Sequence, residues 1–250
     1  MPDKNLAIVV GATGTFGVEI VRQLIDNGLH VLAVGRSADS LASLTEQFSE
    51  VSVVQADISQ DSAIEAIKSA ITGPVKMVVH GPGVAVAGGI LKAPTAAMVD
   101  AVNIKVGGIL RLSRAADEHF SDNARIVAIG GHYGLEPTEY AASAGVANAA
   151  LVNVMRQLSL AYGRRGISAH TIAPGPADSD RLRNVATARA EQRGISVDDV
   201  LEELLEESSV HQFTTAEQVG WAVCNLLDDR AIGMTGSTIM LDSGRRKGLP

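Results

Sequence analysis

Short runs of apolar and β-branched residues alternate with longer helical patterns along the whole chain, and this alternation constrains the fold more than any other feature. Most of the runs are apolar on both faces, as in strands that are covered on two sides. They are LAIVV (6–10), HVLAVG (30–35), VSVVQA (51–56), VKMVVH (75–80), ARIVAIG (124–130), GISAHTIAP (166–174) and STIMLD (237–242). Right-handed crossovers would join such strands into one sheet, so the pattern predicts an α/β fold with a doubly wound, parallel, seven-stranded sheet and helices on both faces.

The helical patterns between these strands cover residues 16–28, 37–50, 62–71, 97–118, 146–164 and 215–227. Two of them begin with the spacing of a capping box, Ser62 with Glu65 and Thr215 with Gln218. The acidic segment 178–209 follows the carboxyl end of a strand, where ligands bind in such sheets. It is a candidate substrate lid or, equally, a solvated surface helix. No linker or repeat interrupts the chain, so we expect residues 1–250 to form a single dinucleotide-binding domain.

Composition excludes several classes of protein. The net charge is −7 and the only basic cluster is the end RRKG, which we expect to be solvated, so nucleic acid is not an expected partner. No apolar run approaches the length of a membrane span, and the chain begins with a strand rather than a signal peptide. The one cysteine, Cys224, cannot form an internal disulfide, and we expect a buried structural thiol rather than a reactive one. A cytoplasmic protein without membrane contact fits these features.

The stretch VVGATGTFG places Gly11, Gly14 and Gly17 directly after the first strand and at the start of a helix. Glycines at this junction allow a tight turn and a close approach of backbone to a pyrophosphate, which the helix N-terminus then attracts. The position predicts a Rossmann-type dinucleotide site, the alternative being a tight turn without a ligand.

The end of the second strand indicates which dinucleotide. Gly35 occupies the place where an acid would bind a ribose 2′-hydroxyl, and Arg36 and Ser37 follow it. Because an arginine there can pair with a 2′-phosphate, NADP(H) is favoured and NAD(H) is less expected. The alternative is that Arg36 stacks on the adenine face.

Together these motifs resemble the short-chain dehydrogenase/reductase (SDR) family over nearly the whole chain. GATGTFG is similar to the family's glycine motif with Thr15 in place of the middle glycine, and ADIS to its adenine-binding motif. HGPG stands where the family has Asn-Asn-Ala-Gly and differs from it in three of four residues. NIKVGG supplies Asn103 in the place of the family's structural and proton-relay asparagine, and APGPADS resembles the segment beside the nicotinamide.

The glycine motif, the end of the second strand and the resemblance together predict a set of cofactor-binding residues. These are Gly11, Thr13, Gly14, Thr15, Phe16, Gly17, Arg36, Ser37, Asp57, Ile58, Gly81, Pro82, Gly83, Asn148, Pro174 and Gly175. No metal site is expected.

The family's catalytic serine, tyrosine and lysine can be placed on this sequence in two registers. Tyr140 in YAAS is similar to the tyrosine of the motif, but Ala144 follows where the lysine should stand. Counting back from Gly166 instead places the trio at Gly131, Ala144 and Asn148. In that register no serine, tyrosine or lysine occupies the trio, and His132 and Tyr140, with Asn103, are the candidate substitutes.

The resemblance implies an NADP(H)-binding oxidoreductase with a degenerate or non-standard active site and an unknown small-molecule substrate. Two alternatives remain: a non-redox enzyme of lyase, isomerase or cyclase type, and an NADP(H)-sensing regulatory pseudoenzyme. The helix at 146–164 is small or apolar on most faces, which together with the resemblance predicts a homodimer or homotetramer.

Overall fold

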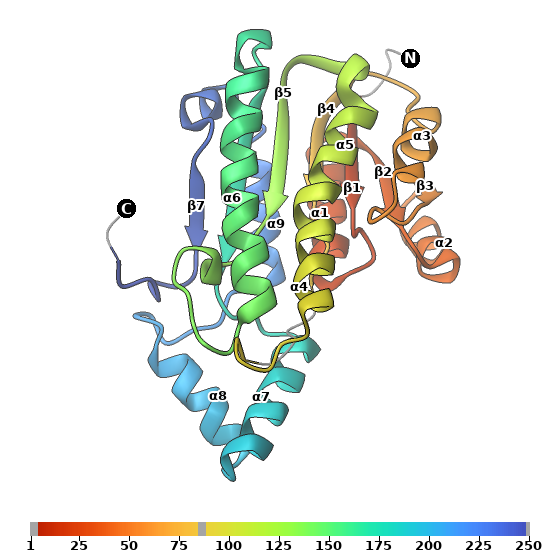
Figure 1. The fold of residues 1–250 in the computed structure, drawn as a ribbon. Helices are drawn as coiled ribbons and strands as arrows, with labels where there is room; N and C mark the ends of the chain where they lie inside the picture. Colours follow the sequence, from red (N-terminus) through yellow and green to blue (C-terminus); the bar gives the residue numbers. More distant parts are fainter. Residues whose placement is uncertain (1–4, 85–88, 249–250) are drawn as a thin grey trace.

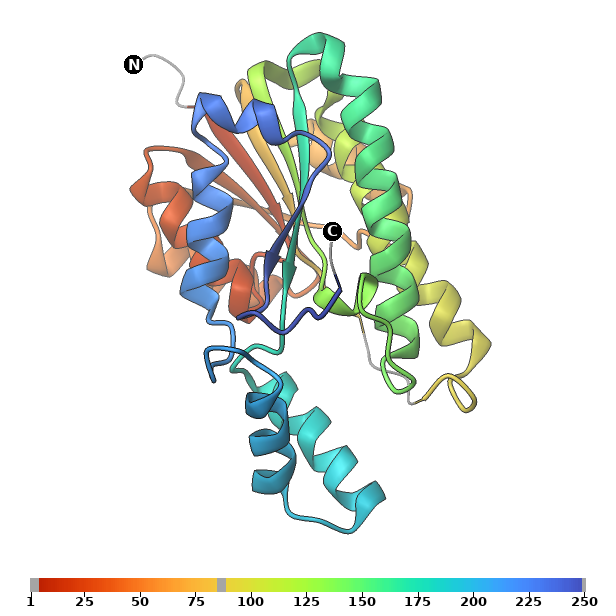
Figure 2. The ribbon, with the colours of Figure 1, turned by 90° about the vertical axis from the view of Figure 1, so that its left-hand side faces the viewer.

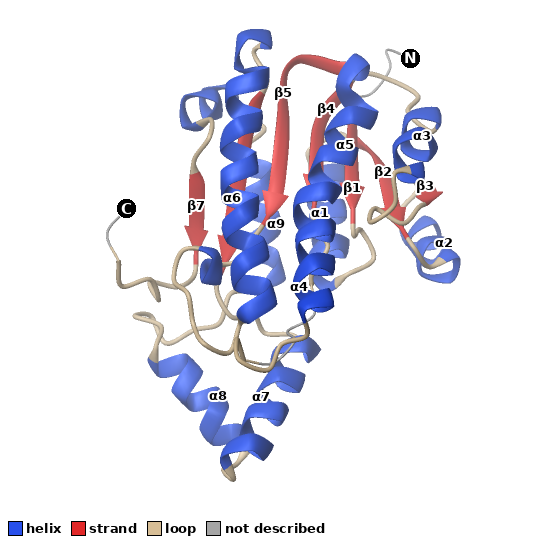
Figure 3. Cartoon of the chain, in the orientation of Figure 1, coloured by secondary structure: helices blue, strands red, loops and turns tan. Residues whose placement is uncertain are grey.

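The computed structural model describes residues 5–84 and 89–248, and its centre is one parallel sheet of seven strands in the order β3-β2-β1-β4-β5-β6-β7 (Figures 1 and 3). The strands are β1 (Leu6–Val10), β2 (His30–Gly35), β3 (Val51–Gln55), β4 (Val75–His80), β5 (Phe120–Ile129), β6 (Ser168–Pro174) and β7 (Thr238–Leu241). The order reverses direction at β1, so the loops after β1 and β4 lie on either side of a topological switch point. The predicted fold class is confirmed.

Helices cover both faces of the sheet. One apolar core packs α1 (Thr15–Asp26), α2 (Ala38–Gln47) and α9 (Ala216–Asn225) against one face. The other core packs α3 (Ser62–Ser69), α5 (Gly108–Ala116) and α6 (Ala142–Tyr162) against the opposite face. Residues of the central strand β1 alternate between the two cores, so this strand is apolar on both sides.

The predicted helix at 97–118 consists of three helical segments in succession. It begins as α4 (Thr95–Val102), passes through a π-helical turn (Asn103–Gly107) and continues as α5. π-Helical turns often occur at functional sites, because the wider turn changes the direction in which its side chains point. This turn lies beside the carboxyl ends of β4 and β5, which it contacts through His80 and Ile129.

The segment predicted as a candidate lid forms two helices, α7 (Asp180–Arg193) and α8 (Val197–Glu206). They extend beyond the carboxyl ends of the strands (Figures 1 and 2). A small apolar cluster of their own holds them together, with Ala186, Ala190, Val200 and Leu204 buried in it. The acidic face of α8 is solvated, as the surface-helix interpretation expected.

Two local predictions at helix starts have opposite outcomes. The capping box of Thr215 and Gln218 is present at the start of α9. The box of Ser62 with Glu65 is wrong, because Asp61 is the N-cap residue and Ser62 already lies inside α3. The carboxylate of Asp61 instead binds Arg111 Nε at 2.6 Å. A partner on another helix has thus taken the place of the local cap.

Three further sequence expectations concern single segments. α6 begins at Ala142, four residues before the predicted start, because Ala142, Ser143 and Ala144 are buried there. The basic end is not fully solvated, since Arg245 is buried and donates to Leu204 O at 2.7 Å. Cys224 is half-buried on α9, and burial raises the pKa of its thiol to about 11. Among the described residues, no helix combines the length and apolar character needed to cross a membrane.

Candidate active site

A cavity of about 510 Å³ extends from the loop after β1, along the carboxyl ends of β4, β5 and β6, to α7. All but one of the predicted cofactor-binding residues line it, which places both sides of the switch point around one space. The exception is Ser37, whose hydroxyl accepts a hydrogen bond from the Ser40 N–H at 3.2 Å and caps α2.

The glycine turn between β1 and α1 is too tight for side chains at two positions. Gly11 has a φ of +81°, and a Cβ there would approach Pro82 N at 3.1 Å. A Cβ on Gly17 would lie 2.1 Å from Gly11 O. Gly14 caps α1 without a side-chain hydrogen bond, so the first N–H groups of this 12-residue helix have no side-chain partner there. Backbone N–H groups at a helix N-terminus beside a cavity suit a pyrophosphate.

The ends of β2 and β3 form the far end of the cavity. Arg36 lines it, and its guanidinium makes no hydrogen bond to the described residues, although its charge helps to lower the pKa of Asp57. The main cause of that lowered pKa is the Ser59 N–H, which donates to Asp57 Oδ1 at 3.0 Å. An ordered carboxylate and an arginine here suit the adenosine end of a nucleotide.

The positions that the sequence register assigns to the trio meet in the middle of the cavity. A Cβ built on Gly131 would lie 2.9 Å from Asn148 Nδ2, so residues 131 and 148 are neighbours in space. Asn148 is buried, and its Oδ1 has no hydrogen-bond partner among the described residues. Ala144, on the same helix, packs with Val84 and Ala147 in an apolar cluster. These three positions therefore present one amide and no hydroxyl or ammonium.

The candidate substitutes His132 and Tyr140 both line the cavity, but neither titrates near neutral pH. His132 is buried, and desolvation followed by the charge of Arg245 lowers its pKa to about 4. Tyr140 lies outside α6, and its hydroxyl hydrogen-bonds to the hydroxyl of Tyr133. Burial raises the pKa of Tyr140 well above its usual value. At neutral pH the histidine is therefore uncharged, and the phenol holds its proton firmly.

Asn103 does not line the cavity. Its Nδ2 donates to Ser59 O at 3.0 Å, and its Oδ1 accepts from Arg111 Nη1 at 2.9 Å. Both ends of the amide are thus engaged with the loop after β3 and with α5. The structure gives Asn103 a role in holding the π-helical turn in place.

The residue that the sequence analysis missed is Lys105, two positions further along the same turn. Its side chain is 3% exposed, and its ammonium donates to Ile129 O at 2.7 Å. Burial, and then the charge of Arg181, lower its pKa to about 7. The available signal was a lysine among small and apolar residues in NIKVGGIL.

Two arginines of α7 complete the lining. Arg181 is partly exposed, but its guanidinium donates to Val84 O, and a Cβ on Gly83 would lie 2.6 Å from its Nη1. Arg189 lies over the ring of Tyr140, with Cζ 3.4 Å from the ring centre. The only carboxylate that lines the cavity within the described ranges is Asp57, at the end formed by β2 and β3.

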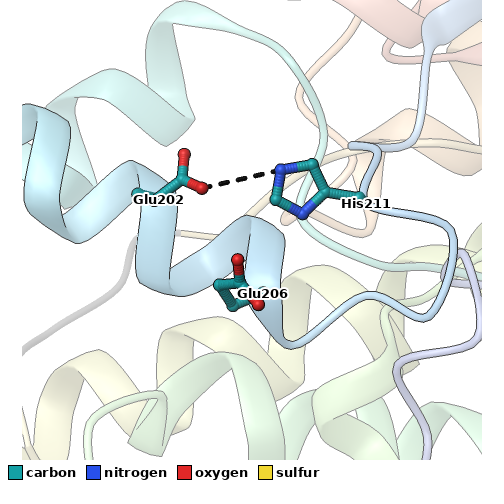
Figure 4. A group of neighbouring side chains, drawn as sticks. All are labelled: Glu202, Glu206 and His211. Carbon is teal, nitrogen blue, oxygen red and sulfur yellow. Dashed lines mark ion pairs between the residues drawn. The ribbon is translucent and has the colours of Figure 1, made fainter.

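Another group of ionisable side chains lies outside the cavity, on and after α8 (Figure 4). Glu202, Glu206 and His211 are exposed, and their nearest nitrogen and oxygen atoms lie within 4.8 Å of one another. His211 Nε2 is 3.6 Å from Glu202 Oε1. Exposed groups of this kind are common on solvated helices, and none of these three residues lines the cavity.

The sheet order, the glycine turn and the cavity at the switch point define a Rossmann-type α/β protein. The family model described as enoyl-(acyl carrier protein) reductase matches residues 11–246. The chain therefore belongs to the short-chain dehydrogenase/reductase family, and it is of the oxidoreductase type.

Relatives in sequence and structure are distant but match over almost their full length. The chain is 25% identical to 3-oxoacyl-[acyl-carrier-protein] reductase FabG of Pseudomonas aeruginosa, over 96% of each chain. Actinorhodin polyketide ketoreductase, solved with NADPH, superposes with a TM-score of 0.91 at 21% identity and 99% coverage of both chains. A short-chain oxidoreductase of P. aeruginosa PAO1, described as containing an atypical catalytic center and solved with NADPH, gives 0.86 at 17% identity and 98% coverage of both.

Proposed function

We propose that the protein is an NADPH-dependent carbonyl reductase with a non-standard active site, in which Lys105 is the proton donor. The observation that carries this proposal is the buried ammonium of Lys105, the one lysine among the described residues that line the cavity. Support for a non-standard site comes from Gly131, Ala144 and Asn148, which lie together where the resemblance expects serine, tyrosine and lysine. The distant relatives that are named as reductases or were solved with NADPH support the reaction class.

The residues that line the cavity fit the parts of NADPH. The turn from Gly11 to Gly17 would hold the pyrophosphate, since Cβ atoms are excluded there and helix N–H groups face the space. Arg36 would pair with the 2′-phosphate, and Asp57 would lie at the adenine. The unpartnered Oδ1 of buried Asn148 would accept a ribose hydroxyl. When bound, NADPH supplies the hydride that reduces a carbonyl carbon.

Lys105 would donate the proton that completes the reduction. Its pKa of about 7 means that it carries a transferable proton near neutrality, as a general acid requires. The proton goes to the carbonyl oxygen as the carbon is reduced, and the neutral amine then regains a proton from water. Before transfer, the ammonium would also stabilise negative charge that develops on that oxygen. The candidate lid at residues 178–209 would exclude water from this end of the cavity.

Titration calorimetry with NADPH and NADH, followed by NADPH absorbance with 3-oxoacyl thioesters and simple ketones, tests the proposal. We expect NADPH to bind more tightly than NADH and to be oxidised with at least one carbonyl substrate. Tyr140→Phe is expected to leave NADPH affinity unchanged within about twofold. A protein that binds neither dinucleotide would contradict the proposal.

Because positions 131, 144 and 148 hold no serine, tyrosine or lysine, a second candidate is an NADP(H)-sensing regulatory protein. It predicts tight NADPH binding and no oxidation with any carbonyl compound. A non-redox enzyme of lyase, isomerase or cyclase type predicts conversion of a substrate without a change in NADPH absorbance. NADPH absorbance therefore separates the reductase from both alternatives, and analysis of the substrates for conversion separates the two alternatives from each other.

A further inference from the structure

Arg189 of α7, which lines the cavity, is positioned by aromatic rings. Arg189 lies 3.4 Å above the ring of Tyr140, close enough for a cation–π contact. Tyr140 is itself held by its hydroxyl hydrogen bond to Tyr133 and by an edge-to-face contact of the two rings, with centroids 5.5 Å apart at 84°. The guanidinium is therefore fixed in place before any ligand arrives.

A stacked guanidinium uses its face for the ring and keeps its N–H groups for ligands in its own plane. The Nε of Arg189 is buried and has no hydrogen-bond partner among the described residues. A buried N–H donor without a partner costs free energy that a ligand can recover. Such a donor is best satisfied by a planar or tetrahedral oxyanion that accepts hydrogen bonds from two N–H groups at once.

The charges that line the cavity favour the same kind of ligand. Lys105, Arg181 and Arg189 carry the positive charges on the side away from Arg36, and no described carboxylate lines that side. Arg181 contacts Gly83 and Val84, which belong to the loop that follows β4 at the cofactor side. Arg189 is therefore the cation left for a substrate. An uncompensated positive cavity with apolar walls concentrates anions.

We propose that Arg189, stacked on Tyr140, binds the carboxylate or phosphate group of an anionic carbonyl substrate. This inference rests on the proposed function, because the substrate lies in the same cavity as NADPH. The inference also gives Tyr140 a new role. The sequence predicted Tyr140 as a candidate acid, and here it is a positioning residue for Arg189. Lys105 then meets the carbonyl oxygen, while Arg189 binds the anionic group.

The test measures binding to the NADP⁺ complex by titration calorimetry, with two matched pairs of probes. Acetoacetate is compared with acetoacetamide, and dihydroxyacetone phosphate with dihydroxyacetone. We expect the anionic member of at least one pair to bind about tenfold more tightly than its neutral partner. The pair that shows the preference distinguishes a carboxylate from a phosphate ligand.

Four variants assign the preference. Arg189→Met should reduce it to within about twofold, while NADP⁺ affinity stays unchanged. Arg193→Met is the matched control, because Arg193 lies one turn further along α7, outside the cavity, and pairs with Glu203 at 2.5 Å. Tyr140→Phe keeps the ring and should keep the preference, whereas Tyr140→Ala should lose it.

Several results would overturn the inference. They are equal binding of anionic and neutral probes, a preference that survives Arg189→Met, and failure of every anionic probe to bind while NADP⁺ still binds. Loss of NADP⁺ and NADPH binding in the unmodified protein would instead contradict the proposed function. The two failures are thus distinguishable in one set of titrations.

Discussion

Replacing Arg36 with alanine isolates the residue on which the choice of cofactor depends. The Arg36 side chain is exposed and makes no hydrogen bond to the described residues, so the substitution should cost little stability. A charge-assisted hydrogen bond contributes about 1.5–3 kcal/mol, and exposure of this side chain to solvent reduces that range to about 1–2 kcal/mol. The expected result is NADPH affinity weakened roughly 5- to 30-fold. NADH lacks the 2′-phosphate, so its affinity should not change.

Titration calorimetry of both cofactors, with the unmodified protein and with Arg36→Ala, measures this difference. Raising the salt concentration should narrow the gap between NADPH and NADH in the unmodified protein, since an exposed ion pair is screened. Arg36→Lys is the control, because it keeps the charge but loses the planar fork. Equal losses for NADPH and NADH would refute the reasoning and assign Arg36 to the adenine face.

Four further outcomes are expected. The lowered pKa of Lys105 means that above about pH 7 the unfolded chain binds more protons than the folded chain. Stability should therefore rise with pH, by up to about 1 kcal/mol per unit towards about pH 8.5, and Lys105→Met should remove that rise in urea unfolding. Gly17→Ala should abolish NADPH binding in calorimetry, because its Cβ would lie 2.1 Å from Gly11 O. Light scattering should give a homodimer or homotetramer, and Leu160→Glu on the exposed side of α6 should weaken it, with a monomer at micromolar concentration contradicting the prediction. Gly131→Ser, Ala144→Tyr and Asn148→Lys should raise ketone turnover only when combined, because such residues act as a unit.

The fold could be predicted because strand patterning and the glycine turn are local signals. Apolar runs that are buried on both faces identify a parallel sheet whichever helices cover it. The errors lie where a tertiary contact replaced a local one. The Asp61 carboxylate binds Arg111 of another helix and makes no capping hydrogen bond at the start of α3, and α6 begins early because its first turn is buried despite Gly145.

The candidate site was predictable at the cofactor end and not at the substrate end. Gly11 and Gly17 are required by backbone geometry, which leaves a pattern in the sequence. Lys105 lines the cavity because a π-helical turn brings it beside Ile129, and no spacing rule anticipates that turn. Arg189 meets Tyr140 only because α7 folds back over the loop before α6, across 49 residues of sequence.

The pH dependence of kcat/KM tests the central claim most directly, since it reports the acid that the reaction needs. It is measured as NADPH oxidation with a carbonyl substrate that the first assays identify. We predict that kcat/KM falls as the pH rises through the pKa of Lys105, about 7 in the free protein, and that Lys105→Met abolishes turnover while NADPH affinity persists. A rate that is constant to high pH, unaffected by Lys105→Met and lost in Tyr140→Phe would contradict the account and make Tyr140 the acid.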